Sequence, residues 1–236
     1  MKIVDKIRIK AKHAIDAAPV KIAILGDSVS HGCFETYLGG GGVYDHAAVY
    51  HSQLKARMEA VFPSCPVAII NAAIGGTTAA RSVERVERDV ISAQPDLTIV
   101  CFGLNDSGGD IDVYANSLRA IFAKLRAADI DTIFMTPNMM CTRTISMIAG
   151  DPYLGGAAEV CSKRQNEGVM DAFMDKAREV CAECGVPVCD CYADWKRLAE
   201  MGADVTSMLA NFVNHPTREM HRLFADRLFD MIFLND

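Results

Sequence analysis

Five short apolar runs recur along the chain, and each is followed by a longer segment with helical spacing. The runs cover residues 20–25, 67–71, 96–102, 131–136 and 186–191. Most are apolar nearly throughout instead of alternating with polar residues, which is typical of strands that are covered on both faces. The longer segments place apolar residues three or four positions apart: 45–62, 78–93, 112–128, 166–184 and 217–234. This alternation predicts one parallel sheet between two layers of helices.

The composition fits one globular domain over residues 1–236. Half of the 236 residues are hydrophobic and 23% are charged, and no linker, repeat or low-complexity tract marks a boundary. Residues 1–15 are predicted to form an additional amphipathic helix on the outside. Two segments interrupt the alternation, the glycine-rich stretch 37–46 and the long connection 138–160, which is predicted to be a loop. Both follow strands, so both could overhang the sheet edge where ligands bind.

The charge pattern argues against several kinds of partner. The formal net charge is −6 and the basic residues are not clustered, so nucleic-acid binding is not expected. No stretch approaches about 18 uncharged apolar residues, so no transmembrane segment is expected. The opening residues "MKIVDKIRIKAKHAID" contain no apolar run of the kind found in secretory signals. We therefore expect a cytoplasmic protein that acts on a small molecule.

Nine cysteines are present, and their number is odd. In a cytoplasmic protein we expect reduced thiols, several of them buried as small hydrophobic side chains. Four stand close together in "CAECGVPVCDC": Cys181, Cys184, Cys189 and Cys191. A CxxC followed by a CxC could hold zinc, but "VPVCDC" is predicted to be a strand, on whose face only one cysteine pair would lie. The sequence favours free thiols, predicts no cofactor and leaves the zinc site open.

Polar residues that can carry chemistry follow the predicted strands. Ser28 in "GDS" follows the first strand, Gly76 in "IGG" follows the second, and Asn105 in "GLND" follows the third. His215 stands in "NFVNHPT", just before the last helical segment. The carboxyl ends of parallel strands meet at one edge of a sheet, so we expect these four residues to converge there.

These residue types are what nucleophilic ester hydrolysis requires. A serine hydroxyl is a weak nucleophile that needs a neighbouring base, and imidazole titrates in the right range, so Ser28 and His215 are the candidate nucleophile and base. Negative charge that develops on the substrate oxygen must meet preorganised N–H donors, and losing one donor commonly raises the barrier by about 3–4 kcal/mol. The candidate donors are the backbone N–H groups of Ser28 and Gly76 and the side-chain amide of Asn105.

Four sequence blocks, in this order, resemble those of the GDSL, or SGNH, hydrolase family. "GDSVSHG" resembles the first block, "NAAIGG" the second, "GLND" the third and "NHP" the last, and the resemblance covers most of the chain. It implies a flavodoxin-like three-layer α/β/α sandwich with a parallel sheet of about five strands. It also implies ester hydrolysis through an acyl-serine, with Ser28 as nucleophile and His215 as base. Ser28, Gly76 and Asn105 would then form the oxyanion hole.

The last block departs from the family pattern, in which an aspartate three residues before the histidine orients the imidazole. Phe212 stands at that place, and Asn211 precedes it. Three partners for the ring remain open: the amide oxygen of Asn211, a backbone carbonyl, or a carboxylate from elsewhere such as Asp204. We take Asn211 as the third candidate catalytic residue. A neutral partner stabilises the imidazolium less than a carboxylate does, so we expect a working but slower enzyme.

The leading prediction is a serine esterase that acts on a small acyl ester, with an O-acetyl group on a carbohydrate as one candidate substrate. The alternatives are a lysophospholipase or thioesterase that takes longer acyl chains, and a catalytically weak ligand-binding domain of the same fold. A dinucleotide-binding fold is disfavoured because no G-x-G-x-x-G follows the first strand. Two further polar residues receive structural interpretations: Asp27 bonds turn amides, and His221 lies on the surface of the last helix.

Overall fold

The centre of the computed structural model, which describes residues 1–234, is a five-stranded parallel sheet. Its strands lie in the order β4–β1–β5–β6–β7. They span β1 Val20–Gly26, β4 Val67–Asn71, β5 Leu97–Cys101, β6 Asp131–Met135 and β7 Val188–Cys189. All four neighbouring pairs are parallel, and Ile24 of β1 is paired with Asn71 on one side and Ile99 on the other. This is the flavodoxin-like strand order, so the predicted fold class is confirmed.

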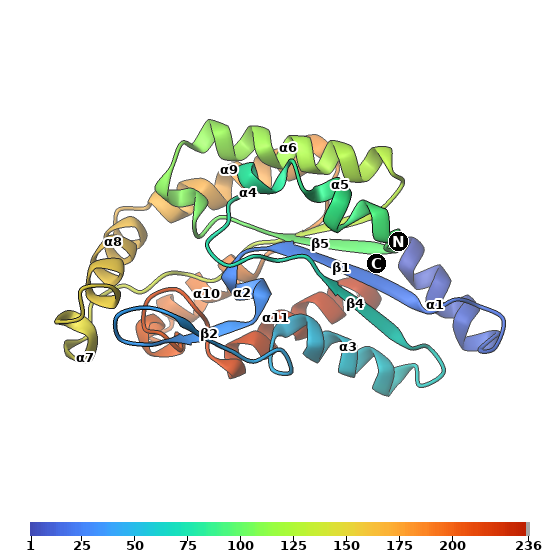
Figure 1. Ribbon diagram of the computed structural model, residues 1–236, viewed down its shortest axis with the longest axis horizontal. Helices are drawn as coiled ribbons and strands as arrows, with labels where there is room; N and C mark the ends of the chain where they lie inside the picture. Colours follow the sequence, from blue (N-terminus) through green and yellow to red (C-terminus); the bar gives the residue numbers. More distant parts are fainter. Residues whose placement is uncertain (235–236) are drawn as a thin grey trace.

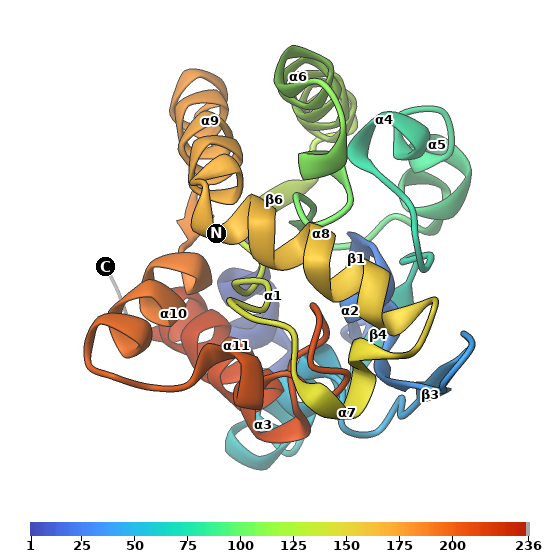
Figure 2. The ribbon, with the colours of Figure 1, turned by 90° about the vertical axis from the view of Figure 1, so that its left-hand side faces the viewer.

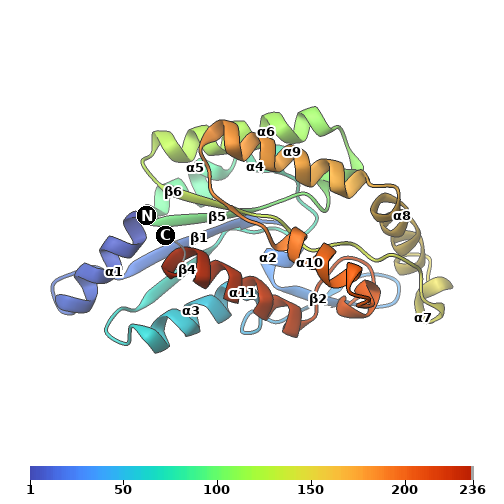
Figure 3. The ribbon, with the colours of Figure 1, turned by 180° about the vertical axis from the view of Figure 1, so that it is seen from behind.

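Helices cover both faces of the sheet (Figure 1). One face carries α4 Ala79–Ser82, α5 Val86–Asp89, α6 Ile111–Ala127 and α9 Val169–Cys184. The other carries α3 Tyr50–Val61, α10 Cys191–Glu200 and α11 Arg218–Phe233, as the view from behind shows (Figure 3). The strand residues Ile24, Ile99 and Phe134 are fully buried between these layers. Burial of such a side chain contributes about 1.5–3 kcal/mol, so the layered packing stabilises the sheet.

The elements that position the site gather at the carboxyl ends of the strands. A two-stranded antiparallel hairpin, β2 Cys33–Thr36 and β3 Gly42–Tyr44, follows the one-turn helix α2 Ser28–His31. Helices α7 Ser146–Ala149 and α8 Leu154–Asn166 lie at the same end, and α8 crosses in front of the strands when the molecule is seen from that side (Figure 2). The N-terminal helix α1, Lys2–Lys12, lies at the opposite end (Figure 1).

Two predicted helices differ from the observed ones near their N-terminal halves. The segment 78–93 is broken into α4, α5 and the 3₁₀ helix η1 Ile91–Ala93. It contains three valines, and β-branched side chains lose rotamer freedom in a helix, which lowers its stability. The segment predicted to start at residue 45 becomes helical only at Tyr50, because Asp45 Oδ1 accepts the backbone N–H groups of Ala47 and Ala48 and holds a turn.

The prediction of a loop over 138–160 is wrong for its second half, where α7 and the start of α8 lie. Gly155 and Gly156 made the start of this helix look like a loop in the sequence, since glycine has low helix propensity. A Cβ at Gly155 would lie 2.8 Å from the carbonyl oxygen of Ile148, so close packing of α7 on α8 requires glycine there. The helix predicted over 166–184 is observed as α9, which begins at Val169 because Gly168, with a φ of +78°, separates it from α8.

The last predicted strand, 186–191, is reduced to the two residues of β7. Asp190 Oδ1 accepts the backbone N–H of Ala193 at 3.2 Å and begins α10, which places Cys191 in a helix. All nine cysteines are free thiols, and Cys184 alone among them is not buried. Within residues 1–234, no group of three or more His, Cys, Asp or Glu side chains is arranged to hold a metal ion. In the same range, every helix is too short or too polar to cross a membrane.

Candidate active site

The candidate nucleophile Ser28 stands at the start of α2, directly after β1. Asp27 caps this one-turn helix, because its Oδ1 accepts the backbone N–H of Val29 at 3.0 Å. This is the turn-amide contact that the sequence predicts for Asp27. Gly26 permits the sharp turn, since a Cβ there would lie 2.9 Å from the carbonyl oxygen of Cys101. The turn therefore holds Ser28 half-buried at the sheet edge, where it lines a pocket.

His215 contacts Ser28 from the loop that precedes α11. Its Nε2 lies 2.9 Å from Ser28 Oγ, and its Nδ1 lies 3.1 Å from the carbonyl oxygen of Phe34 in β2. A carbonyl oxygen only accepts, so Nδ1 carries the hydrogen and Nε2 accepts from the serine hydroxyl. The structure thus brings the predicted nucleophile and base together in the protonation state that proton abstraction requires.

The imidazole of His215 is 8% exposed, and this burial dominates its electrostatics. Burial lowers the pKa of His215 to about 4, while the hydrogen bond to the Phe34 carbonyl opposes this change. The ring is therefore neutral at physiological pH. A neutral imidazole that is already oriented can accept the hydroxyl proton directly.

Asn211 does not contact the His215 ring, so the prediction that its amide oxygen orients the imidazole is wrong. Its Oδ1 instead accepts three backbone N–H groups, those of Val213 at 3.0 Å and of Asn214 and His215 at 2.9 Å each. Asp204 also lies away from the ring and pairs with Arg143. Of the three open partners, the backbone carbonyl is the one observed, and Asn211 shapes the loop that carries the base.

The β2–β3 hairpin that supplies the Phe34 carbonyl is fastened to α11 by Arg218. The guanidinium of Arg218 donates to Glu35 at 2.5 Å and to Asp45 at 2.8 Å. Its Cζ also lies 4.5 Å from the centroid of the Phe34 ring. These contacts place the hairpin against the helix that follows His215, because Arg218 is only three residues further along the chain. Arg218 therefore holds the hairpin that supplies the carbonyl close to the loop that carries His215.

The candidate oxyanion donors border the same pocket as Ser28. Gly76 has a φ of +72°, a left-handed conformation that favours glycine, and a Cβ there would meet no atom within 4 Å. Asn105 donates from Nδ2 to the carbonyl of Thr77 at 3.0 Å, and the same nitrogen lies 3.5 Å from Asp27 Oδ2. These contacts fix the amide of Asn105 at the pocket wall, next to Ser28 and Gly76.

Two buried carboxylates support these donors. Asp106 accepts the backbone N–H groups of Ala79 at 2.8 Å and Gly103 at 3.1 Å, which ties the chain after β4 to the end of β5. Burial raises the pKa of Asp106 to about 6. Burial likewise raises the pKa of Asp27 to about 7; the Val29 N–H opposes the rise and the nearby Asp106 carboxylate adds to it. Asp27 and Asp106 are therefore buried carboxyl groups beside the oxyanion donors.

The pocket in front of Ser28 has a volume of about 380 Å³. Its wall is formed by three segments that lie far apart in the sequence: the β2–β3 hairpin, the first half of α8 and the loop that carries His215. The hairpin contributes Thr36 and Tyr44, and α8 contributes Leu154 and Ala157. The site is a small mixed cleft with room for a short acyl group beside the serine.

Three contributions to this site were missed or misread from the sequence. The carbonyl of Phe34 carries no side-chain signal, and Arg218 looks like any charged residue near a helix start. His221 was expected at the surface but is fully buried: its Nδ1 accepts the backbone N–H of Tyr50 at 3.2 Å, and its ring lies 4.6 Å from the Phe34 ring. Its spacing from Phe224, Ala225 and Leu228 (i+3, i+4 and i+7) was the available signal that it lies on the buried face of α11.

The chain is similar in sequence to known ester hydrolases. The model of the GDSL-like lipase/acylhydrolase family matches residues 24–223. An acetylxylan esterase of Geobacillus stearothermophilus is 25% identical over 130 residues, and the match spans 50% of this chain and 59% of that enzyme, less than two thirds of its length.

Solved structures show the same fold. Axe2, an acetylxylan esterase from Geobacillus stearothermophilus, superposes with a TM-score of 0.69 at 20% identity over 92% of this chain and 95% of that one. LAE5, an α/β hydrolase enzyme from the metagenome of Lake Arreo, superposes with a TM-score of 0.68 at 22% identity over 93% and 98%. Two further structures are catalytic mutants of Axe2, one with a serine and one with an aspartate replaced by alanine. The matched residues include all four sequence blocks and the paired Ser28 and His215, and the chain belongs to the GDSL-like lipase/acylhydrolase family.

Proposed function

We propose that this protein is a serine esterase that hydrolyses short acyl esters, and that an acetyl group on a carbohydrate is its substrate. The observation that carries the proposal is the 2.9 Å contact between His215 Nε2 and Ser28 Oγ, with the Phe34 carbonyl behind the ring. Family membership supports ester hydrolysis. The name of the acetylxylan esterase relative supports the choice of a sugar acetate.

In the proposed reaction, Ser28 Oγ attacks the ester carbonyl carbon and its proton passes to Nε2 of His215. The electron pair of the carbonyl moves onto oxygen, where the N–H groups of Ser28 and Gly76 and the amide of Asn105 stabilise it. Collapse of this intermediate breaks the bond to the alcohol, which leaves with the proton from Nε2. Water then attacks the acyl-serine with the same base, and the carboxylic acid is released.

The aspartate that is replaced in one catalytic mutant of Axe2 points to a carboxylate in that enzyme's mechanism. In this chain we assign its orienting role to the Phe34 carbonyl. An uncharged partner fixes the tautomer and the ring plane, but it stabilises the imidazolium less than a carboxylate would. We therefore propose a catalytic dyad with a main-chain third member.

The test is covalent labelling together with turnover. A fluorophosphonate probe should label the wild type at Ser28, and p-nitrophenyl acetate should be hydrolysed. Ser28→Ala should lose the label and about 10⁴-fold or more in kcat, because the nucleophile is absent. A folded wild type that neither reacts with the probe nor hydrolyses the acetate would refute the proposal. A series of p-nitrophenyl esters from acetate to decanoate should show the highest kcat/KM for the shortest acyl groups; a preference for long chains would indicate a lysophospholipase or thioesterase instead.

A further inference from the structure

A second pocket of about 410 Å³ adjoins the one that contains Ser28. The two pockets share three lining residues, Asn105, Cys161 and Asn214, so they are continuous along one wall. The second pocket lies between α8 and the short 3₁₀ helix η2, Asp106–Gly108, which follows the third block. Of the charged side chains that line it, Asp106 supports the oxyanion donors, whereas Asp110 and Arg164 have no part in the proposed chemistry at Ser28 and His215.

Arg164 of α8 is the cationic side chain of this second pocket. It is half-buried, and within residues 1–234 it forms no ion pair with a carboxylate. The guanidinium instead lies flat against Gly108: a Cβ at that residue would be 2.8 Å and 2.9 Å from its two terminal nitrogens. Glycine at position 108 thus leaves the space that the guanidinium occupies. An arginine with five N–H donors and no acidic partner is available to a ligand.

Polar groups with complementary roles surround this guanidinium. Asn214 uses its Oδ1 to accept from Asn211 at 3.1 Å, which leaves its NH₂ group without an acceptor among the described residues. Asp110 uses Oδ1 to cap α6, where it accepts the N–H groups of Asp112 and Val113, and its second oxygen remains an acceptor at the pocket rim. Donors from α8 and from the loop that carries His215 therefore line the same pocket as an acceptor from the start of α6. Neighbouring hydroxyls of a sugar, which both donate and accept, match such a set.

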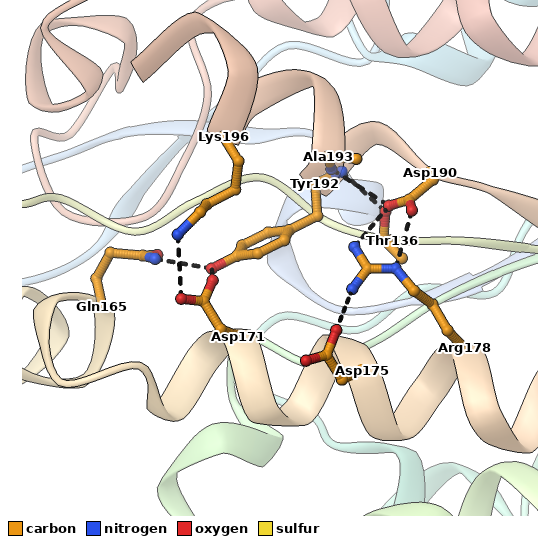
Figure 4. Close-up of polar contacts among 9 residues, drawn as sticks. All are labelled: Thr136, Gln165, Asp171, Asp175, Arg178, Asp190, Tyr192, Ala193 and Lys196. Carbon is orange, nitrogen blue, oxygen red and sulfur yellow. Dashed lines mark hydrogen bonds and ion pairs between the residues drawn. The ribbon is translucent and has the colours of Figure 1, made fainter. Parts of the chain in front are cut away.

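Hydrogen bonds to residues of α9 and α10 hold the end of α8 that carries Arg164 (Figure 4). The next residue, Gln165, accepts the backbone N–H of Met140 at 2.9 Å and donates to Tyr192 Oη at 2.7 Å. Tyr192 in turn donates to Asp171 Oδ1 at 2.7 Å, and Lys196 donates to Asp171 Oδ2 at 3.1 Å. Because this chain of contacts fixes α8 to α9 and α10, the guanidinium is positioned before any ligand binds.

A second set of contacts in the same view joins the neighbouring elements. Arg178 of α9 donates to Asp190 from Nε at 2.8 Å and from a terminal nitrogen at 3.0 Å, and Thr136, just after β6, donates to the same carboxylate at 3.0 Å (Figure 4). The α9–α10 support to which α8 is fastened is therefore itself tied to the sheet.

We propose that the second pocket binds the neutral sugar portion of the ester, and that Arg164 is its specificity-determining residue. The inference rests on the proposed acetyl-ester function. An acetyl group has only two carbons and is too short to extend from Ser28 into the second pocket. The part of the substrate that reaches Arg164 therefore belongs to the alcohol. The nearby carboxylates of Asp106 and Asp110 favour hydroxyls over an anionic group. Arg164 binds and orients this portion and takes no part in bond breaking.

The experiment compares two acetate esters with the same variants. p-Nitrophenyl acetate lacks a sugar, whereas acetylated xylo-oligosaccharides present hydroxyls beyond the scissile bond. Arg164→Ala should lower kcat/KM for the sugar acetates about tenfold, through KM, because a hydrogen bond from a charged donor is lost. It should leave p-nitrophenyl acetate within about twofold of the wild type, since that ester does not reach Arg164. Lys163→Ala is the matched control, because it removes an equal charge from the same helix at a side chain that is 71% exposed.

A second variant tests the same inference without removing the arginine. Gly108→Ala would put a methyl group where the guanidinium lies and displace it, while the φ of residue 108 is one that alanine adopts. The same selective loss on sugar acetates is expected. Equal losses on both esters, or no loss on sugar acetates, would overturn the subsite and leave the esterase proposal intact. A wild type that hydrolyses p-nitrophenyl acetate but not sugar acetates would overturn the subsite and the carbohydrate substrate, and would leave only the short-ester esterase. A wild type that hydrolyses neither ester would overturn both.

Discussion

The two sides of the candidate active site are built in different ways. The nucleophile side, which comprises Ser28, Gly76 and Asn105, follows the ends of three neighbouring strands, β1, β4 and β5. The base side, which comprises His215 and the Phe34 carbonyl, lies on a loop and on a hairpin outside the main sheet. The first side takes its geometry from the sheet itself. The second depends on a few hydrogen bonds and ion pairs between segments nearly two hundred residues apart.

Because of this difference, a single substitution disrupts the geometry of the base side more easily than that of the nucleophile side. On the nucleophile side, buried strands and the carboxylate of Asp106 hold the backbone, so single surface changes have little influence there. On the base side, one amide oxygen organises the loop and one guanidinium fastens the hairpin, so a single substitution can misplace the imidazole. A misplacement of about 1 Å in a catalytic group can reduce the rate about 100-fold.

The largest effect on the base side is expected for Asn211→Ala. It leaves three backbone N–H groups without their acceptor in a region where Asn211 is only 6% exposed. We expect kcat to fall about 100-fold and the free energy of unfolding to fall by about 3 kcal/mol. Steady-state kinetics and urea denaturation would measure the two effects.

Asn211→Asp is the matched variant, because a carboxylate oxygen can accept the same three N–H groups. It should recover most of the stability and the rate. If Asn211→Ala keeps wild-type kcat, the loop does not depend on this amide and the contrast between the two sides disappears.

A smaller effect is expected for Arg218→Ala. The variant removes the ion pairs to Glu35 and Asp45 and frees the hairpin that carries the Phe34 carbonyl. We expect kcat to fall about tenfold with little change in KM, since the imidazole loses its fixed partner but the pocket remains. The stability change should be small, because Arg218 and its partners are partly exposed and such pairs contribute about 0–1 kcal/mol.

Lysine at position 218 should restore part of kcat, since it keeps the charge but not the forked geometry. Arg222→Ala, on the same helix and 67% exposed, is the control and should behave as the wild type. Equal losses in the Arg218→Ala and Arg222→Ala variants would mean that the charge of α11, and not the hairpin, sets the rate.

The pH dependence of kcat/KM tests whether His215, on the base side, is buried in the free enzyme. His215 must be neutral to accept the serine proton, and burial lowers its pKa to about 4. Activity on p-nitrophenyl acetate should therefore persist as pH falls and decline only near pH 4, well below the ordinary histidine range. A decline centred near pH 6.5 would show that the imidazole is not buried in the free enzyme.

The last effect concerns the nucleophile side and is measured as stability, not as rate. The pKa of Asp27 is raised to about 7 in the folded protein, above its ordinary value of 3.8, so the folded state holds the proton more tightly. The contribution of Asp27 to stability therefore decreases as pH rises from about 4 to about 7 and is constant above that. Asp27→Asn removes this dependence, so its melting temperature should improve relative to the wild type across this window. A difference that stays the same from pH 4 to pH 8 would contradict the buried, neutral carboxyl.

The sequence was sufficient for the nucleophile side and insufficient for the base side, for a physical reason. Ser28, Gly76 and Asn105 are found because each follows an apolar run that becomes a strand, and parallel strands bring their ends together without further information. His215 is found by its sequence block. Its partner is not found, because every residue has a main-chain carbonyl and no residue type marks this one in the sequence. Helix α8 was missed in part because Gly155 and Gly156 make its first turn look like a loop, although close packing on α7 requires glycine there.

The Phe34 carbonyl has a consequence for how such a site can change over generations. Every amino acid brings the same carbonyl group, so no single codon change deletes the acceptor behind the histidine. Substitutions at position 34 change only how the hairpin packs, so activity can change gradually. An enzyme with an acidic partner would lose that group in a single substitution.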